Sequence, residues 1–310
     1  MNVTLMTNLD LSGAKVLIRE DLNVPIHDGQ VSSDARIRAA VPTIRKALDQ
    51  AAQVILMSHL GRPSEGEFTH IASLQPVADH LSVLLGEPVT LIRNWQNGLE
   101  DNNNKLVMLE NVRFNEGEKA NDDTLAQSYA ALCDIFVMDA FGTAHRAHAS
   151  TTIVAQFFED KCAGYIMGNE LNNAKKVLED PKRPFTAIMG GAKISDKIMI
   201  IEKLLNKVDH LIIGGGMSYT FSKAQGGAIG KSLCEDNRMA LTLELIEKAK
   251  AKGVKLYLPL DNVIADDFSN NAHRQIVNSG EISDDWEGLD IGPQSINAFE
   301  NVIKNSKTIY

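Results

Sequence analysis

The stretch CDIFVMDAFGTAHRAHAST (133–151) joins an apolar run to a cluster of basic side chains, and it decides the fold class. Residues 135–138 are apolar without a break, which is typical of a strand buried on both faces of a parallel sheet. His145, Arg146 and His148 follow this run closely. Ligands of open parallel sheets bind beyond the carboxyl ends of the strands. The stretch therefore predicts an α/β fold with an anion site at one sheet edge.

Similar runs rich in Val, Ile and Leu recur along the chain, with helical segments between them. They are KVLIR (15–19), QVILM (53–57), VTLI (89–92), LVML (106–109), FTAIM (185–189), LIIG (211–214), KLYLPL (255–260) and KTIY (307–310). Continuous apolar strands that alternate with helices indicate parallel sheets covered on both faces. We therefore expect a three-layer α/β architecture.

Helical spacing is clearest in two segments. Residues 34–51 follow a Ser33 or Asp34 cap, and Pro42 within them predicts a kink or a later start. Their apolar face consists of Ile37, Val41, Ile44 and Leu48. Residues 195–209 follow a Ser195 cap. Their apolar face consists of Ile198, Ile201, Leu205 and Val208.

Residues 159–180 predict a connecting helix, and the Pro-punctuated stretch DPKRP (180–184) follows it. Together they divide the chain in two. We place the first domain at residues 1–162, a connecting helix and hinge at 163–184, and the second domain at 185–310. The chain of 310 residues has a hydrophobic fraction of 44%, which is enough for roughly two domains.

Charge and cysteine content exclude several classes of protein. A net charge of −9 offers no general footprint for nucleic acid or an anionic membrane. The cysteines Cys133, Cys162 and Cys234 form no CxxC pair, which favours a reducing compartment. No signal peptide and no apolar stretch of membrane-spanning length is apparent. We expect a cytoplasmic protein with neither nucleic-acid nor membrane partners.

Basic and polar side chains follow the strands of the first half at the ends where a ligand would bind. They are Asp21, Asn23, His59, Arg62, Arg113, His145, Arg146 and His148. Any one of them has an ordinary explanation as a solvated loop residue, and no spacing typical of a zinc site is present. Their common position at strand ends instead predicts an anion pocket with bidentate donors. A small phosphorylated acid fits this pocket better than a dinucleotide does.

The second half offers a glycine-rich turn of a different kind. Gly190 and Gly191 follow the strand 185–189, and Lys193 and Lys197 lie four residues apart in position to reach one anion. A tight turn before an exposed helix explains the same stretch equally well. Gly214, Gly215 and Gly216 form a second such turn. GGAIGKS (226–232) is one residue short of a P-loop, and GGGMSY (214–219) does not fit GxGxxG.

Ten motifs occur in the order and wording of phosphoglycerate kinases, and the sequence resembles this family over nearly its whole length. They are REDLNVP (19–25), DARIRAA (34–40), SHLGRP (58–63), LENVRF (109–114), DAFGTAHRAH (139–148), GGAKISDKI (190–198), IIGGGM (212–217), IGKSL (229–233), LPLDNVIAD (258–266) and GLDIGP (288–293). The resemblance implies two Rossmann-like domains that face a cleft.

The resemblance also implies the roles of individual residues. The phosphoglycerate site would comprise Asp21, Asn23, Arg36, His59, Arg62, Arg113 and Arg146, with His145 and His148 in supporting positions. The nucleotide site would comprise Gly191, Lys193, Lys197, Gly215 and Gly216. Without the resemblance, Arg36 is most simply an exposed helix residue. With it, Arg36, Lys193 and Lys197 become the expected catalytic residues.

The implied reaction is the glycolytic transfer of a phosphoryl group from 1,3-bisphosphoglycerate to ADP, which gives 3-phosphoglycerate and ATP. Such a transfer needs positioning and charge stabilisation and no protein nucleophile. The nucleotide would bind as Mg-ADP or Mg-ATP, and the family implies a monomer.

The family's sequences continue beyond a strand like KTIY (307–310) with WNGP, GGGD(S/T) and STGGGA motifs, which this sequence does not contain. The aspartate that serves the metal belongs to that continuation, so we expect no metal ligand here. In one hypothesis, which we favour, the natural chain continues past Tyr310 and is a kinase. In the other, it ends at Tyr310 and is a phosphoglycerate-binding module.

Overall fold

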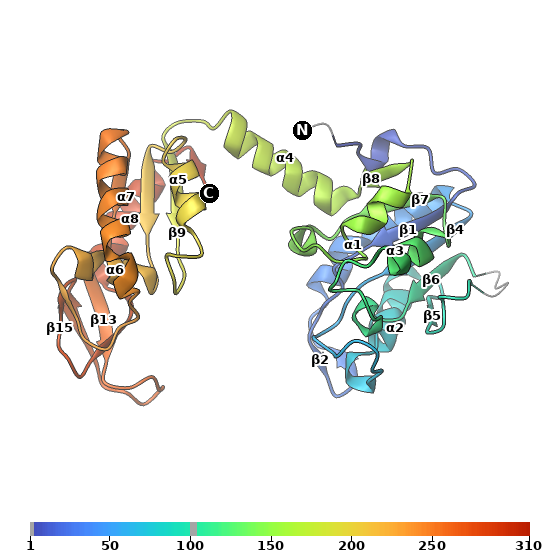
Figure 1. The fold of residues 1–310 in the computed structure, drawn as a ribbon, viewed down its shortest axis with the longest axis horizontal. Helices are drawn as coiled ribbons and strands as arrows, with labels where there is room; N and C mark the ends of the chain where they lie inside the picture. Colours follow the sequence, from blue (N-terminus) through green and yellow to red (C-terminus); the bar gives the residue numbers. More distant parts are fainter. Residues whose placement is uncertain (1–2, 100–103) are drawn as a thin grey trace. The chain divides into compact units, whose positions relative to one another are not determined.

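The computed structural model describes residues 3–99 and 104–310. The chain divides into two compact units, Met1–Asn173 and Ala174–Tyr310, each of which is described by itself (Figure 1). The division falls inside the helix α4 (Tyr165–Glu179). No helix within the described ranges is long and apolar enough to cross a membrane.

Unit 1 is built on a six-stranded sheet in the order β5-β6-β4-β1-β7-β8. Every pairing in it is parallel. The strands are β1 (Lys15–Arg19), β4 (Gln53–Met57), β5 (Thr90–Ile92), β6 (Leu106–Leu109), β7 (Ile135–Met138) and β8 (Lys161–Ala163). The short strands β2 (Ile26–His27) and β3 (Gln30–Val31) form a separate antiparallel pair. The carboxyl ends of β6, β4, β1 and β7 therefore lie side by side.

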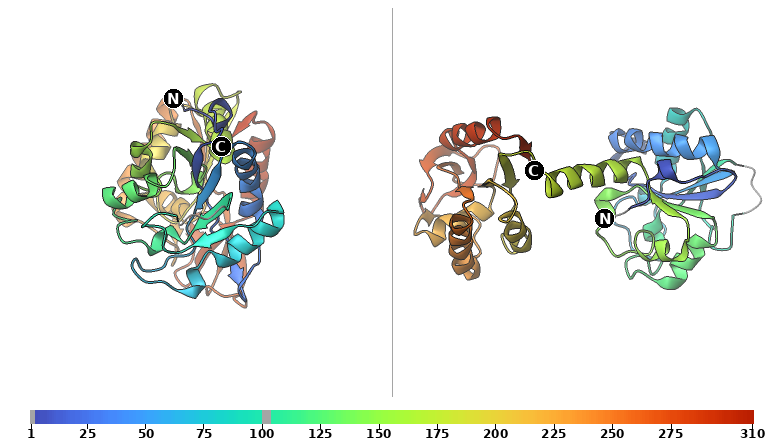
Figure 2. Two further views of the ribbon diagram at one scale, coloured as in Figure 1. Left: turned by 90° about the vertical axis from the view of Figure 1, so that its right-hand side faces the viewer. Right: turned by 90° about the horizontal axis from the view of Figure 1, so that it is seen from above.

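Helices cover both faces of this sheet, as the right-hand view of Figure 2 shows. Val16 and Ile18 of β1 pack in one core with α1 (Ala35–Gln50) and α2 (Gln75–Leu85). Leu17, which lies between them in β1, packs in the other core with α3 (Asp123–Ala130) and η5 (Ile153–Phe157). The strands are buried on both faces because alternate side chains enter opposite layers. The predicted three-layer α/β architecture is confirmed here.

Unit 2 contains a four-stranded parallel sheet in the order β12-β10-β9-β17. Its strands are β9 (Phe185–Met189), β10 (His210–Ile213), β12 (Lys255–Tyr257) and β17 (Thr308–Ile309). The helices α5 (Ile198–Leu204), α6 (Met217–Ala224) and α7 (Met239–Ala251) pack against one core. Helix α8 (Pro293–Lys304) packs against Ile212 in another core. The predicted parallel strands of the second half are therefore present.

Unit 2 also contains antiparallel structure that the sequence pattern did not predict. Strand β13 (Asp261–Ala265) pairs with β14 (Arg274–Asn278) and with β16 (Glu287–Ile291). A further short pair joins β11 (Ala228–Ile229) to β15 (Glu281–Ile282) in parallel. Four of the five residues of β14 are exposed, so this strand lacks the apolar run by which the other strands were recognised.

Three predictions about helix boundaries are wrong. The segment 159–180 is not one helix, because residues 161–163 form the edge strand β8. Helix α1 does not start late, since it begins at Ala35 and continues through Pro42. Ser195 does not cap α5, which begins three residues later at Ile198.

Candidate functional site

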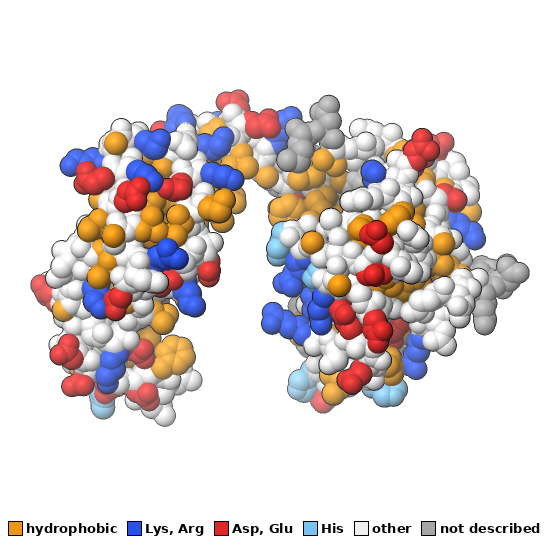
Figure 3. Space-filling view, in the orientation of Figure 1, with side chains coloured by type: hydrophobic (Ala, Val, Ile, Leu, Met, Phe, Trp, Pro, Cys, Tyr) orange, Lys and Arg blue, Asp and Glu red, His pale blue; other side chains and the backbone are white. Residues whose placement is uncertain are grey.

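The predicted anion site lies at the carboxyl edge of the sheet in unit 1. The loops after β1, β4, β6 and β7 carry the residues expected there, and these strand ends are neighbours. In the space-filling view, Lys or Arg and His side chains gather at one margin of this unit (Figure 3). Since parallel strands point the same way, loops far apart in the sequence meet at this edge.

Arg36 reaches the edge from the first turn of α1. Its Nη1 atom donates a hydrogen bond of 2.7 Å to Oδ2 of Asp21, which lies in the loop after β1. Asn23 in the same loop accepts a bond of 2.9 Å from the backbone N–H of Gly61, in the loop after β4. These bonds link Arg36 to the loop after β1, and that loop to the loop after β4.

His59 lies at the centre of the cluster and is buried. Burial, together with the charges of four neighbouring guanidinium groups, lowers the pKa of His59 to about 2. These groups belong to Arg19, Arg113, Arg146 and Arg36. At neutral pH the imidazole is uncharged, so it contributes hydrogen bonds to the site and no positive charge.

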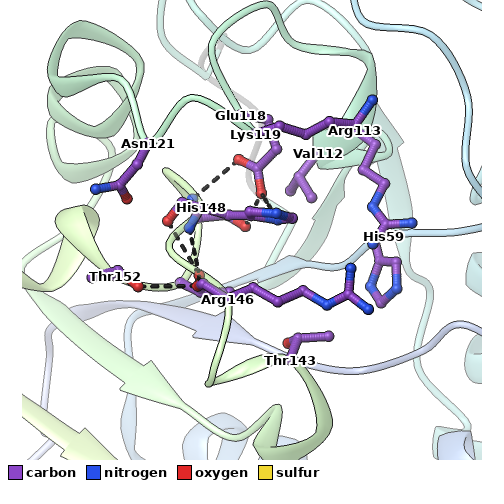
Figure 4. Close-up of polar contacts among 12 residues, drawn as sticks. His59, Val112, Arg113, Glu118, Lys119, Asn121, Thr143, Arg146, His148 and Thr152 are labelled. Atoms are coloured by element: carbon purple, nitrogen blue, oxygen red, sulfur yellow. Dashed lines mark hydrogen bonds and ion pairs between the residues drawn. The ribbon is translucent and has the colours of Figure 1, made fainter. Parts of the chain in front are cut away.

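The side chains of Arg113 and Arg146 both reach toward His59, Arg113 from above and Arg146 from the left in Figure 4. Arg113 is buried, and its Nη1 atom donates to the carbonyl of Gly61. Burial lowers the pKa of Arg113, and the nearby charges of Arg146 and Arg62 add to this effect. Arg146 is exposed on the loop after β7. The guanidinium groups that were expected at one edge are therefore close enough to interact.

The two histidines beside Arg146 differ in their surroundings. His145 is exposed, whereas His148 is half-buried with its Nδ1 atom 3.8 Å from Oε1 of Glu118. Burial lowers the pKa of His148, and the charges of Arg113 and Arg146 act in the same direction. His148 is therefore also neutral near pH 7, which is consistent with a supporting position.

Two charged residues of this cluster were missed by the sequence analysis. Arg19, the last residue of β1, is only 1% exposed and places Nη2 at 3.4 Å from Nδ1 of His59. Its Nε atom donates to Oγ of Ser150. Glu118 is completely buried and accepts a hydrogen bond of 2.6 Å from the same hydroxyl. The sequence signal for Arg19 was its place at the end of an apolar strand. It was counted as part of the strand 15–19 and was not considered as a site residue.

Glu20 follows Arg19 and was also missed. It is completely buried, and neither carboxylate oxygen has a hydrogen-bond partner among residues 3–99 and 104–310. Burial raises the pKa of Glu20 well above its usual value, and the carboxylates of Asp139 and Asp21 add to the effect, which Arg19 opposes. Asp139 itself accepts hydrogen bonds from Thr43 and from the backbone N–H of Met167. An uncompensated charge at Glu20 would be costly, so we expect Glu20 to hold a proton.

Replacing Glu20 by glutamine should therefore stabilise unit 1 at neutral pH. Folded Glu20 keeps its proton to a higher pH than unfolded Glu20, so wild-type stability falls as pH rises between the two pKa values. Glu20→Gln should gain about 1–3 kcal/mol at pH 7. The gain should shrink as the pH falls toward the ordinary glutamate pKa of about 4.3. Urea unfolding from pH 4.5 to 8.5, followed by Trp95 fluorescence in a Trp286→Phe background, measures this difference.

The control for this experiment is Glu87→Gln, which makes the same chemical change at an exposed position. It should follow the wild-type profile. A difference between Glu20→Gln and wild type that does not change with pH would show that Glu20 is not the titrating group.

In unit 2, the two glycine turns pack backbone against backbone at the ends of β9 and β10. A Cβ atom on Gly215 would stand 2.9 Å from the backbone nitrogen of Gly191, and the φ of Gly215 is +67°. The Nζ atom of Lys197 lies 2.9 Å from where a Cβ of Gly191 would stand. The structure thus brings Gly191, Gly215 and Lys197 together. Gly216 lies directly before α6, and Lys193 is exposed in the glycine turn after β9.

The segment after this turn is held by a residue that the sequence analysis did not consider. Glu235 accepts hydrogen bonds from the backbone N–H groups of Ile194 and Ser195, at 2.7 and 3.1 Å. The Ser195 hydroxyl donates to the other oxygen of Glu235 at 2.6 Å. This is why Ser195 does not cap α5, and these two N–H groups are already satisfied.

Fold and site together define a class of protein: a two-unit α/β protein whose parallel sheets end in an arginine-rich cluster and in a glycine-lysine turn. Both arrangements suit phosphorylated ligands. The chain belongs to the phosphoglycerate kinase family, whose model matches residues 6–310.

Two solved structures are similar to this one. Phosphoglycerate kinase from Coxiella burnetii shares 45% sequence identity with the chain, at a TM-score of 0.88, over 99% of this chain and 79% of that one. Phosphoglycerate kinase from Pyrococcus horikoshii OT3 shares 22% identity, at a TM-score of 0.80, with the same coverage of 99% and 79%. The second likeness supports the fold alone.

Proposed function

We propose that the chain acts as a phosphoglycerate kinase, which transfers a phosphoryl group reversibly between 1,3-bisphosphoglycerate and ADP. Unit 1 would bind the phosphoglycerate, and unit 2 would bind the nucleotide. The observation that carries this proposal is the convergence of Arg36, Arg113 and Arg146 around the neutral His59, with Arg62 near Arg113 at the same sheet edge. Membership of the family supports the same reaction.

The chemistry requires little more than positioning and charge. A loose phosphoryl transition state is stabilised by cations that meet its equatorial oxygens, and it needs no protein nucleophile. Guanidinium groups can hold the phosphate and carboxylate of a three-carbon acid through paired N–H donors. Arg36 is exposed, and among the described residues its side chain binds Asp21 alone; it is the group we assign to charge stabilisation. Lys193 and Lys197 would bind the nucleotide phosphates, beside Gly191, Gly215 and Gly216.

Magnesium enters this proposal as part of the nucleotide substrate. Within the residues that the structure describes, no group of three or more His, Cys, Asp or Glu side chains could hold a metal ion. Mg²⁺ bound to ADP or ATP would neutralise the phosphate charge.

Two measurements test the proposal. Calorimetric titration with 3-phosphoglycerate tests the site in unit 1, and a coupled assay for ATP formation from ADP and 1,3-bisphosphoglycerate tests turnover. We expect binding that disappears in an Arg113→Met/Arg146→Met variant. Binding without turnover would favour the second hypothesis, a phosphoglycerate-binding module. Absence of binding would refute the assignment of the site.

A further inference from the structure

The loop that carries Arg146 is anchored at one buried side chain, Glu118. Three hydrogen bonds join Glu118 to consecutive residues of this loop: the Glu118 carbonyl accepts from Ala149 N–H at 2.9 Å, and its carboxylate accepts from the N–H and hydroxyl of Ser150 at 3.1 and 2.6 Å. Figure 4 shows Glu118 directly above this loop. The carboxylate is completely buried, so these bonds are not exchanged with water.

The anchored segment in turn fixes the backbone of Arg146. The Arg146 carbonyl accepts hydrogen bonds from the hydroxyls of Thr151 and Thr152, at 2.7 and 3.1 Å, and from His148 N–H at 2.9 Å. The side chain of Arg146 is exposed, and within the part of the chain that the structure describes it makes no hydrogen bond of this kind. Its position therefore depends on the backbone that Glu118 holds through residues 149 and 150.

Glu118 is itself held rigidly from a third loop. Glu65, in the loop after β4, accepts hydrogen bonds from the backbone N–H groups of Gly117 and Lys119, at 3.3 and 2.9 Å. These residues flank Glu118 on either side. The loops after β4, β6 and β7 thus form one connected network with Glu118 at its centre.

A carboxylate in this place is unexpected, because the surrounding arginines are arranged to bind an anion. Glu118 lies near Arg19 and Arg113, and its negative charge repels a phosphorylated ligand. If Glu118 acted only through its charge, it would lower the affinity of the site for an anionic ligand. We therefore expect a structural contribution of Glu118 that offsets this repulsion.

We propose that Glu118 is a positioning residue for phosphoglycerate binding, which holds Arg146 in place by anchoring residues 149–150. The proposal rests on the function proposed above for unit 1. Anchoring of the loop and repulsion of the ligand by the Glu118 charge have opposite effects on ligand affinity. The direction of the affinity change in a Glu118 variant therefore distinguishes the two roles. Loss of the carboxylate should weaken ligand binding if Glu118 positions Arg146, and should strengthen it if only its charge matters.

The test is calorimetric titration of Glu118→Gln and Ser150→Ala with 3-phosphoglycerate. We expect each variant to bind roughly tenfold more weakly, the effect of one lost hydrogen bond to a charged group. The double variant should bind no more weakly than about the worse single variant, because both changes break the same contact. The affinity for ADP, a ligand assigned to unit 2, should be unchanged. Wild-type or tighter binding by Glu118→Gln would overturn the proposal.

Glu116→Gln is the matched control, because it makes the same change in the same loop at an exposed side chain. It should bind as the wild type does. If Glu118→Gln fails to fold, Ser150→Ala decides the question, since it removes the hydroxyl's hydrogen bond to Glu118 and retains the charge.

A second measurement does not depend on the ligand. Amide hydrogen exchange of the free protein should become faster in residues 144–152 of Glu118→Gln and remain unchanged in the strands of the sheet. Unchanged exchange in 144–152 would also overturn the proposal. If wild-type protein does not bind 3-phosphoglycerate, the proposed function fails, and the exchange result still shows whether Glu118 anchors this loop.

Discussion

Replacing Arg36 by lysine should lower the turnover number by roughly 10³-fold, comparable to the loss of an arginine that stabilises charge in other phosphoryl transfers. Arg36 presents a planar guanidinium from the first turn of α1, and its side chain is 54% exposed beside Asp21. Lysine keeps the charge but cannot offer two parallel N–H donors to the transferring group. The coupled assay for ATP formation measures the effect, with 1,3-bisphosphoglycerate and ADP at saturating concentrations.

Arg38→Lys provides the control on the same helix. Arg38 is also exposed, but it pairs with Asp34 at 2.8 Å rather than with Asp21. The control should retain wild-type turnover. Turnover by Arg36→Lys within about tenfold of wild type would remove Arg36 from its assigned role, because an arginine that stabilises the transition state is expected to contribute far more.

Most of the parallel strands were predictable because they are continuous apolar runs. The observed bounds of β1, β4, β6 and β9 coincide with the runs read from the sequence. Strand β8 was absorbed into a predicted helix, since its three residues are too few to show a period. Strand β14 pairs in an antiparallel sheet with its side chains mostly exposed, so tertiary pairing forms it without an apolar signal.

Residues of the predicted anion site could be identified from the sequence only where they directly follow a strand. That rule selected His59, Arg62, Arg113 and Arg146, but it could not select Arg36, which belongs to a helix and was assigned through family resemblance. The buried charges Arg19, Glu20 and Glu118 lie outside the rule for another reason. Their importance depends on desolvation and on partners distant in the sequence, as in the 131-residue separation of Arg19 and Ser150.

Replacing Arg19 by methionine should lower the free energy of unfolding of unit 1 by about 3–5 kcal/mol, the usual cost of removing one partner of a buried charge pair. Arg19 is 1% exposed and Glu118 is fully buried, with the Ser150 hydroxyl between them. Methionine fills much of the same volume but removes the positive charge that acts on the Glu118 carboxylate. Urea unfolding followed by Trp95 fluorescence, again in the Trp286→Phe background, measures the loss at pH 7.

Two comparisons separate the lost charge pair from simple loss of packing. Arg62→Met removes an exposed guanidinium from the same edge and should change the stability little. The double variant Arg19→Met/Glu118→Leu should lose less than the sum of its single changes, because no buried charge is left alone. A deficit equal to that sum would show that Arg19 and Glu118 act independently.

The loss in the free energy of unfolding caused by Arg19→Met should change with pH in one direction. Burial raises the pKa of Glu118, and the positive charge of Arg19 opposes that rise. Without Arg19, folded Glu118 would take up a proton at a higher pH than in the wild type, and protonation removes the cost of a lone buried carboxylate. The stability deficit of Arg19→Met should therefore be largest at neutral pH and should decrease as the pH falls toward 5. A deficit that stays constant or grows on acidification would mean that Arg19 stabilises unit 1 through its packing and not through its charge.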